Sequence, residues 1–94
     1  GITVVIPSRD GKALLEQLLP QVLAEKEVTE VIVVDNGSAD NSAALAGERI
    51  RFLVHPEALS FAAAVNLGIR AAKTSHVCLL NNDMEIEEGF FAAL

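Results

Sequence analysis

The chain has 94 residues, a formal net charge of −6 and an apolar content of 51%. This length allows one domain, whose core must be aliphatic because its only aromatic residues are four phenylalanines. The acidic balance, with no cluster of lysine or arginine, excludes nucleic-acid binding. No apolar run approaches the about 20 residues that span a membrane, and no signal peptide is recognisable.

The single cysteine indicates a reducing compartment. Cys78 lies in the apolar run HVCLL and has no second cysteine with which to form a disulfide. We therefore expect a cytoplasmic protein in which Cys78 is a small buried apolar residue.

The two ends suggest a single domain over residues 1–94 that is a fragment of a longer chain. Gly1 is followed at once by a core strand, and the sequence EEGFFAAL stops within an amphipathic segment. An isolated fragment of this kind is expected to expose apolar surface and to self-associate.

The first half of the chain predicts a strand, a helix and a second strand. Residues 2–6 are a short β-branched run ended by Pro7, which is typical of a strand covered on both faces. Residues 11–26 carry leucines and valines at helical spacing, but a proline inside a helix costs about 3 kcal/mol. At Pro20 we therefore expect a kink, or a break at which a second helical piece begins. Residues 31–34 predict the second strand.

The segment DNGSADNS, residues 35–42, has two interpretations. Asn-Gly after a strand is a hairpin signal, but the following AALAGER is helical in composition. We expect a loop and then a short helix with Asn41 or Ser42 as its N-cap. Residues 50–54 predict a third strand, placed at an edge by Arg51 in its middle and closed by Pro56.

The last part predicts a helix, a strand and the start of another helix. Residues 60–73 form an apolar helix with Ser60 as its cap and basic residues in its last turn. Residues 76–80 predict the fourth strand, and a final helix is expected to start after the segment NNDMEIEEG. Strands that alternate with helices indicate a parallel α/β sheet with helices on both faces.

Polar residues gather where three of these strands end. The first is followed by PSRD, the second by Asp35 and Asn36, and the fourth by NND, residues 81–83. Ligands bind outside the carboxyl ends of strands in an open parallel sheet, which predicts a site at this edge. For each single loop, turn formation explains the polar residues as well as ligand binding does. Residues 40–42 are better explained as capping residues than as ligand-binding residues.

Several common sites are excluded because their motifs are missing. The sequence has no G-x-G-x-x-G, no phosphate-binding G-x-x-x-x-G-K-[ST], no G-x-S-x-G and no Cys/His cluster. Asp83 is the best metal candidate, because magnesium-like ions take one or two carboxylates and complete their shell with water and phosphate.

Four segments, VVIPSRDG, EVIVVDNGSAD, FAAAVNLGIRAA and CLLNNDMEI, resemble the N-terminal half of family-2-type glycosyltransferases with the GT-A fold. The resemblance covers essentially the whole chain. It implies a Rossmann-like α/β sheet of strand order 3-2-1-4, a nucleoside diphosphate sugar as donor, UDP- or dTDP-linked, and a divalent metal, Mn²⁺ or Mg²⁺.

The resemblance also implies roles at the base-binding end. Pro7, Ser8 and Arg9 match the loop that lies against the nucleotide base. Asp35 matches an acid that accepts a hydrogen bond from the base N–H, a task suited to a carboxylate. Ser60 matches a position near the base, although Leu59 and Ser60 replace a glycine that often stands there.

At the diphosphate end, residues 81–83 match the family's Asp-x-Asp segment. Asp83 would meet the metal and Asn82 would lie near the ribose. Asn81 replaces the first acid of the segment, and its amide can still bond a ribose hydroxyl.

The implied reaction is glycosyl transfer to an acceptor hydroxyl, which needs a general base. The chain offers no candidate base, so we expect it to hold the donor and to be inactive alone. Two alternatives remain. A non-catalytic or receiver-like α/β module would want a phosphoacceptor Asp after the third strand, where VHP stands. A sugar nucleotidyltransferase would want a Gly-rich loop in place of PSRDGK.

Overall fold

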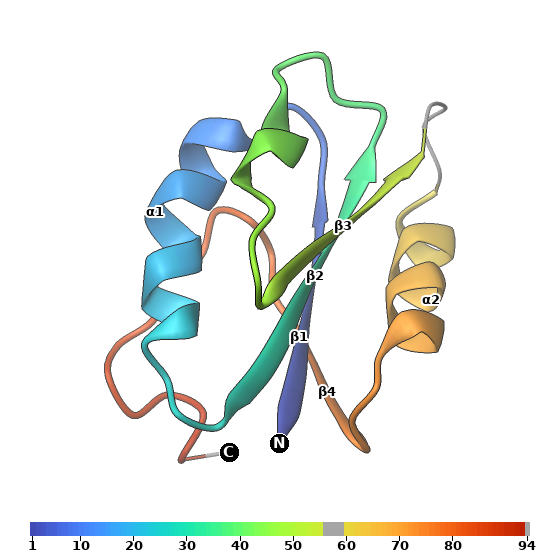
Figure 1. Ribbon diagram of the computed structural model, residues 1–94. Helices are drawn as coiled ribbons and strands as arrows, with labels where there is room; N and C mark the ends of the chain where they lie inside the picture. Colours follow the sequence, from blue (N-terminus) through green and yellow to red (C-terminus); the bar gives the residue numbers. More distant parts are fainter. Residues whose placement is uncertain (56–59, 94) are drawn as a thin grey trace.

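The computed structural model describes residues 1–55 and 60–93 (Figure 1). Its centre is a four-stranded sheet of order β3-β2-β1-β4 in which all pairings are parallel. The strands are β1 (Ile2–Ser8), β2 (Val28–Asn36), β3 (Ile50–His55) and β4 (His76–Leu79). The predicted α/β sheet, its strand order and the edge position of Arg51 are confirmed.

Two helices cover opposite faces of the sheet, α1 (Lys12–Leu23) and α2 (Phe61–Ala71) (Figure 1). Successive strand residues point to opposite faces, so Val4 and Ile6 pack with α1 while Val5 packs with α2. All three are fully buried. The interior strands are therefore apolar on both faces, as the continuous β-branched runs predict.

Gly68 allows α2 to approach the sheet closely. A Cβ atom at this position would lie 3.2 Å from Val34 Cγ2 and closer still to the Val5 side chain. Glycine has a low helix propensity and so destabilises α2 locally, but it permits this close packing against the sheet.

Helix α1 runs without interruption through Pro20, so the predicted break is wrong. Because Pro20 has no N–H, the carbonyl of Glu16 has no intrahelical donor. Both residues are exposed. On an exposed face water can replace that bond, which makes the proline tolerable.

The short helix after β2 is a 3₁₀ helix, η1 (Ser42–Leu45). Asn41 precedes it with a φ of 62° and makes no side-chain cap. The Asp40 carboxylate accepts the Ser42 N–H at 3.1 Å instead. The predicted helix is thus present with Asn41 at its N-cap position, as predicted, but the capping carboxylate comes from Asp40.

The end of the chain differs from the prediction. β4 ends at Leu79, and the described residues after it form turns rather than a final helix. A single α-type hydrogen bond joins Ala93 N–H to Gly89 O at 3.2 Å. Phe91 is 2% exposed and joins the core on the α1 face. This burial anchors the segment without a helix.

Two further expectations concern single residues. Cys78 is half-buried rather than fully buried, and burial raises the pKa of its thiol, as befits a packing residue. Pro56, expected to close the third strand, and Leu59, expected to replace a glycine together with Ser60, lie outside the described residues.

Within residues 1–55 and 60–93, no helix has both the length and the apolar character needed to cross a membrane.

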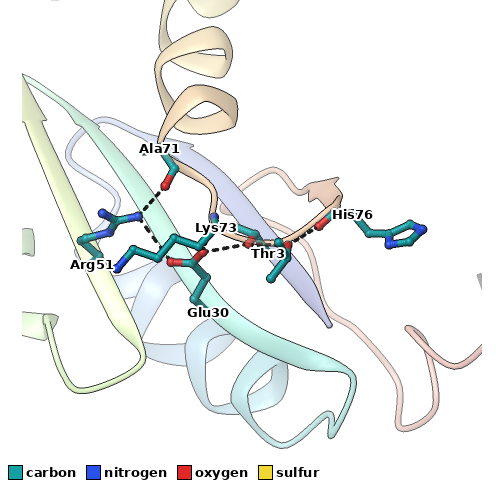
Figure 2. Close-up of polar contacts among 7 residues, drawn as sticks. Thr3, Glu30, Arg51, Ala71, Lys73 and His76 are labelled. Atoms are coloured by element: carbon teal, nitrogen blue, oxygen red, sulfur yellow. Dashed lines mark hydrogen bonds and ion pairs between the residues drawn. The ribbon is translucent and has the colours of Figure 1, made fainter.

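A polar cluster closes the amino edge of the sheet (Figure 2). Glu30 Oε2 accepts the Lys73 backbone N–H at 2.8 Å and the Thr3 hydroxyl at 3.0 Å. Its Oε1 pairs with the Arg51 guanidinium at 3.4 Å. The same guanidinium donates to Ala71 O at 2.7 Å. This amino-edge cluster (Thr3, Glu30, Arg51 and Lys73) joins three strands to the segment between α2 and β4.

The cluster keeps Glu30 ionised. Burial raises the pKa of Glu30, but the Lys73 N–H, the Thr3 hydroxyl and the charges of Arg51 and Lys73 lower it by more. The pKa therefore lies below its ordinary value, and the carboxylate holds its three partners, Thr3, Arg51 and Lys73, at neutral pH.

Candidate functional site

The carboxyl ends of β1 and β2 lie side by side. Ser8 pairs with Asp35 in the parallel register, and the two residues are 5% and 3% exposed. Asp35 Oδ1 accepts the Ser38 N–H at 3.1 Å, across a turn in which Gly37 has a φ of 82°. One carboxylate oxygen of Asp35 therefore holds its own loop in place.

Backbone-to-side-chain hydrogen bonds tie the loops after β1 and β2 together. Asp10 N–H donates to Ser38 Oγ at 2.8 Å, and Asp10 Oδ1 accepts the Ala39 N–H at 2.7 Å. Asp40 Oδ2 accepts the N–H of Lys12, the first residue of α1, at 2.9 Å. The Ser42 hydroxyl and the Lys12 N–H hold the pKa of Asp40 below its usual value. The expectation that residues of this loop serve as caps is confirmed for Asp40.

Asn82 joins the end of β4 to the end of β1. Its Nδ2 donates to Ser8 Oγ at 3.1 Å across 74 positions of sequence. Gly11 makes room for this contact, since a Cβ there would lie 2.8 Å from Ser8 Oγ and closer to Asn82 Nδ2. Three strand ends thus meet at one edge of the sheet, as the sequence predicts.

An open pocket of about 280 Å³ lies at this edge. Four of the predicted site residues line it: Pro7, Ser8, Arg9 and Asn82. Three further residues line it: Asn36, Phe61 and Ala64. The sequence places Asn36 at this edge without giving it a role, and it does not indicate Phe61 or Ala64. Asn36 follows Asp35 directly, and Phe61 is an aromatic residue left 60% exposed in the first turn of α2.

The other predicted site residues lie at the same edge but do not line the pocket. Asp35 is buried beside Ser8. Ser60 is the N-cap of α2, as predicted, and its Oγ accepts the Ala63 N–H at 3.2 Å. Asn81 and Asp83 are exposed on either side of Asn82.

Asp83 fits a divalent metal as one ligand of a shared shell. In the described part of the chain, no three Asp, Glu, His or Cys side chains come together to hold an ion. An exposed carboxylate such as Asp83 can still complete a shell made mostly of water and phosphate oxygens. A metal would therefore fit here together with a diphosphate rather than alone.

A family model described as Glycosyl transferase family 2 matches residues 3–94. The chain belongs to this family. Membership of family 2 favours a glycosyltransferase over the receiver-like module and the sugar nucleotidyltransferase that the sequence left open.

Two curated relatives carry glycosyltransferase names. Pre-mycofactocin glycosyltransferase of Mycobacterium tuberculosis is 35% identical over 97 residues, which cover 99% of this chain and 20% of that protein. Glycosyltransferase GlyG of Streptococcus pneumoniae is 28% identical over 100 residues, covering 99% of this chain and 33% of GlyG. The chain thus spans between a fifth and a third of the length of these relatives.

Solved structures of TarS from S. aureus share the fold. The structure of TarS 1–349 superposes with a TM-score of 0.85 at 17% identity, over 98% of this chain and 30% of that one. The same protein in complex with UDP gives a TM-score of 0.83 at 18% identity. This chain therefore has the same α/β fold as the matching part of TarS.

Proposed function

We propose that this chain is the donor-binding half of a glycosyltransferase and holds a nucleoside diphosphate sugar at the carboxyl edge of its sheet. The observation that carries this proposal is the pocket lined by Pro7, Ser8, Arg9 and Asn82. Membership of family 2 and the UDP in the TarS complex support the ligand class. A UDP- or dTDP-sugar is the donor that we expect.

At the base-binding end, Pro7 and Arg9 would lie against the base. Asp35 would accept the base N–H through Oδ2, because its Oδ1 already accepts from Ser38. The Ser60 oxygen accepts from the α2 backbone, which leaves the hydroxyl proton to donate toward the base.

At the diphosphate end, Asn82 would lie near the ribose, held there by its bond to Ser8. The Asn81 amide would bond a ribose hydroxyl, and the Asp83 carboxylate would provide one ligand to Mn²⁺ or Mg²⁺. Such a cation, when bound, stabilises the negative charge of a departing diphosphate.

Transfer itself requires an acceptor hydroxyl to attack the anomeric carbon while a general base removes its proton. None of the residues assigned above takes that role. We therefore propose that the chain alone binds the donor without transferring the sugar. We also propose a cytoplasmic location, because the one cysteine has no second cysteine in the chain with which to form a disulfide.

Calorimetric titration of the full chain with UDP, with and without Mn²⁺, tests this proposal. We expect UDP to bind about tenfold tighter with the cation, because the cation bridges Asp83 and the diphosphate. Asp83→Asn should abolish this difference. Glu85→Gln, a matched loss of one exposed acid two residues away, should retain it.

Two results would contradict different parts of the proposal. Equal UDP affinity of the wild type with and without Mn²⁺ would show that Asp83 is not a metal ligand. No UDP binding under either condition would remove the donor-binding role altogether.

A further inference from the structure

A second pocket, of about 590 Å³, lies at the C-terminal end of α1. Its walls come from the turn 24–27 and from residues 86–92, which pass beside the lower end of α1 in Figure 1. The turn leads directly into the first residue of β2, so this α1-end pocket lies at the amino edge of the sheet, opposite the proposed donor site. Gln21 Oε1 accepts the Ile86 N–H at 2.8 Å and fixes the two walls together.

Glu25 is the residue that makes this pocket notable. It lines the pocket, is 6% exposed, and its Oε1 is buried without a hydrogen-bond donor from any described residue. Its backbone is fixed, because its N–H donates to Val22 O and its carbonyl accepts from Val28 N–H, both at 3.1 Å. A buried carboxylate oxygen without a donor is unfavourable, so Glu25 Oε1 calls for a partner.

The surroundings of Glu25 favour a cation as that partner. Glu27 and Glu88 line the same pocket, against one basic residue, Lys26. None of these three side chains forms an ion pair within the described ranges. Helix α1 has no basic residue in its last turn, so the negative end of its dipole is also uncompensated.

The dimensions and lining of the pocket indicate an organic cation. In the part of the chain that the structure describes, no three acidic, histidine or cysteine side chains gather to hold a metal ion. The pocket has room for a larger group, and Ala24, Ile86 and Ala92 offer apolar walls for methylene groups. A guanidinium is planar, weakly hydrated and rich in donors, and it matches a carboxylate well.

We propose that the α1-end pocket binds an alkylguanidinium cation, which donates to the Glu25 carboxylate and lays its methylene stem against Ile86. The same chemistry is available from a small-molecule guanidine or from an arginine side chain of a polypeptide. This site is independent of the proposed donor site, and its test does not involve nucleotides.

The test is a titration of the full chain with butylguanidinium and with its neutral analogue butylurea, followed by the amide chemical shifts of residues 24–27 and 86–92. We expect saturable shifts with the cation and none with butylurea. Glu25→Gln should weaken binding about tenfold or more, since a charged hydrogen-bonded pair is lost. Glu16→Gln, the same change at an exposed position of α1 outside the pocket, should leave the affinity unchanged.

A parallel titration with the peptide Gly-Gly-Arg-Gly-Gly distinguishes the two sources, with the citrulline peptide as its neutral control. Tighter binding of the arginine peptide supports a polypeptide ligand, and tighter binding of butylguanidinium supports a small molecule. The proposal is overturned if neither cation binds, if butylurea binds as well as butylguanidinium, or if Glu25→Gln binds as tightly as the wild type. The comparison of butylguanidinium with butylurea uses only the wild type, so it decides the matter even if Glu25→Gln does not fold.

Discussion

Asp35 lies at the end of β2 with 3% of its surface exposed, beside Ser8 in the sheet. The sequence shows that a carboxylate stands at the end of a buried strand, but it does not show that this carboxylate holds the following turn. Its Oδ1 closes the turn through Ser38 N–H. In our proposal the second oxygen meets the nucleotide base, so the residue joins loop formation to ligand binding.

Replacing Asp35 by asparagine separates these two tasks. The amide oxygen can still accept the Ser38 N–H, so the free energy of unfolding should change by less than about 1 kcal/mol. UDP affinity should fall about tenfold, because a charge-assisted acceptor becomes a neutral one. Calorimetry and thermal unfolding measure the two effects.

The control for this substitution is Asp10→Asn. The Asp10 side chain is exposed and accepts from the Ala39 N–H, a bond that the asparagine oxygen can keep, so UDP affinity should be retained. An Asp35→Asn variant that binds UDP as tightly as the wild type would remove Asp35 from the site.

The residues of the pocket were predictable only in part. The rule that ligands bind at strand ends selected Pro7, Ser8, Arg9 and Asn82, all of which line the pocket. It could not select Phe61, because nothing in a helical segment shows that one aromatic side chain stays 60% exposed at a pocket rim. Contacts across long sequence separations, such as the one between Asn82 and Ser8, are also invisible in a single sequence.

At the scale of elements, short apolar runs located each of the strands that the structure describes, and the errors in the strands lie at their boundaries. β2 begins at Val28, three residues before the predicted start. The polar residue Glu30 hid this start, because its partners Thr3, Arg51 and Lys73 lie 21 to 43 positions away. A charged residue is compatible with a strand once tertiary contacts satisfy it.

Glu30→Gln should destabilise the protein at neutral pH by about 1–3 kcal/mol, because hydrogen bonds and an ion pair to a largely buried carboxylate are weakened. The pKa of Glu30 is lowered in the folded state, so the stability it contributes is present above its ordinary pKa of 4.5 and is lost as the pH falls through the lower folded value. The difference between variant and wild type should therefore shrink in acid.

Urea unfolding at neutral and at acidic pH measures this difference. Glu48→Gln is a suitable control, since Glu48 is exposed near the amino-edge cluster, and its effect should stay within about 0.5 kcal/mol. If the difference in unfolding free energy between Glu30→Gln and the wild type stayed constant with pH, the stabilising role assigned to the Glu30 charge would be contradicted.

For the whole molecule, the parallel arrangement gives the two sheet edges different characters. The amino-edge cluster joins the strands at one edge, while the loops after β1, β2 and β4 surround a pocket at the other. Alternation of strands and helices predicts a parallel sheet, but it does not determine the strand order. That order came from the resemblance to family 2, and it is what brings the ends of β1 and β4 together.

The most direct test of the donor site is a map of the amide chemical shifts of the full chain on addition of UDP and Mn²⁺. We expect the largest changes at residues 7–9, 35–36 and 81–83, and little change at residues 24–27 around the α1-end pocket. Saturable changes that leave the first three segments unaffected would contradict the assignment of nucleotide binding to the carboxyl edge of the sheet.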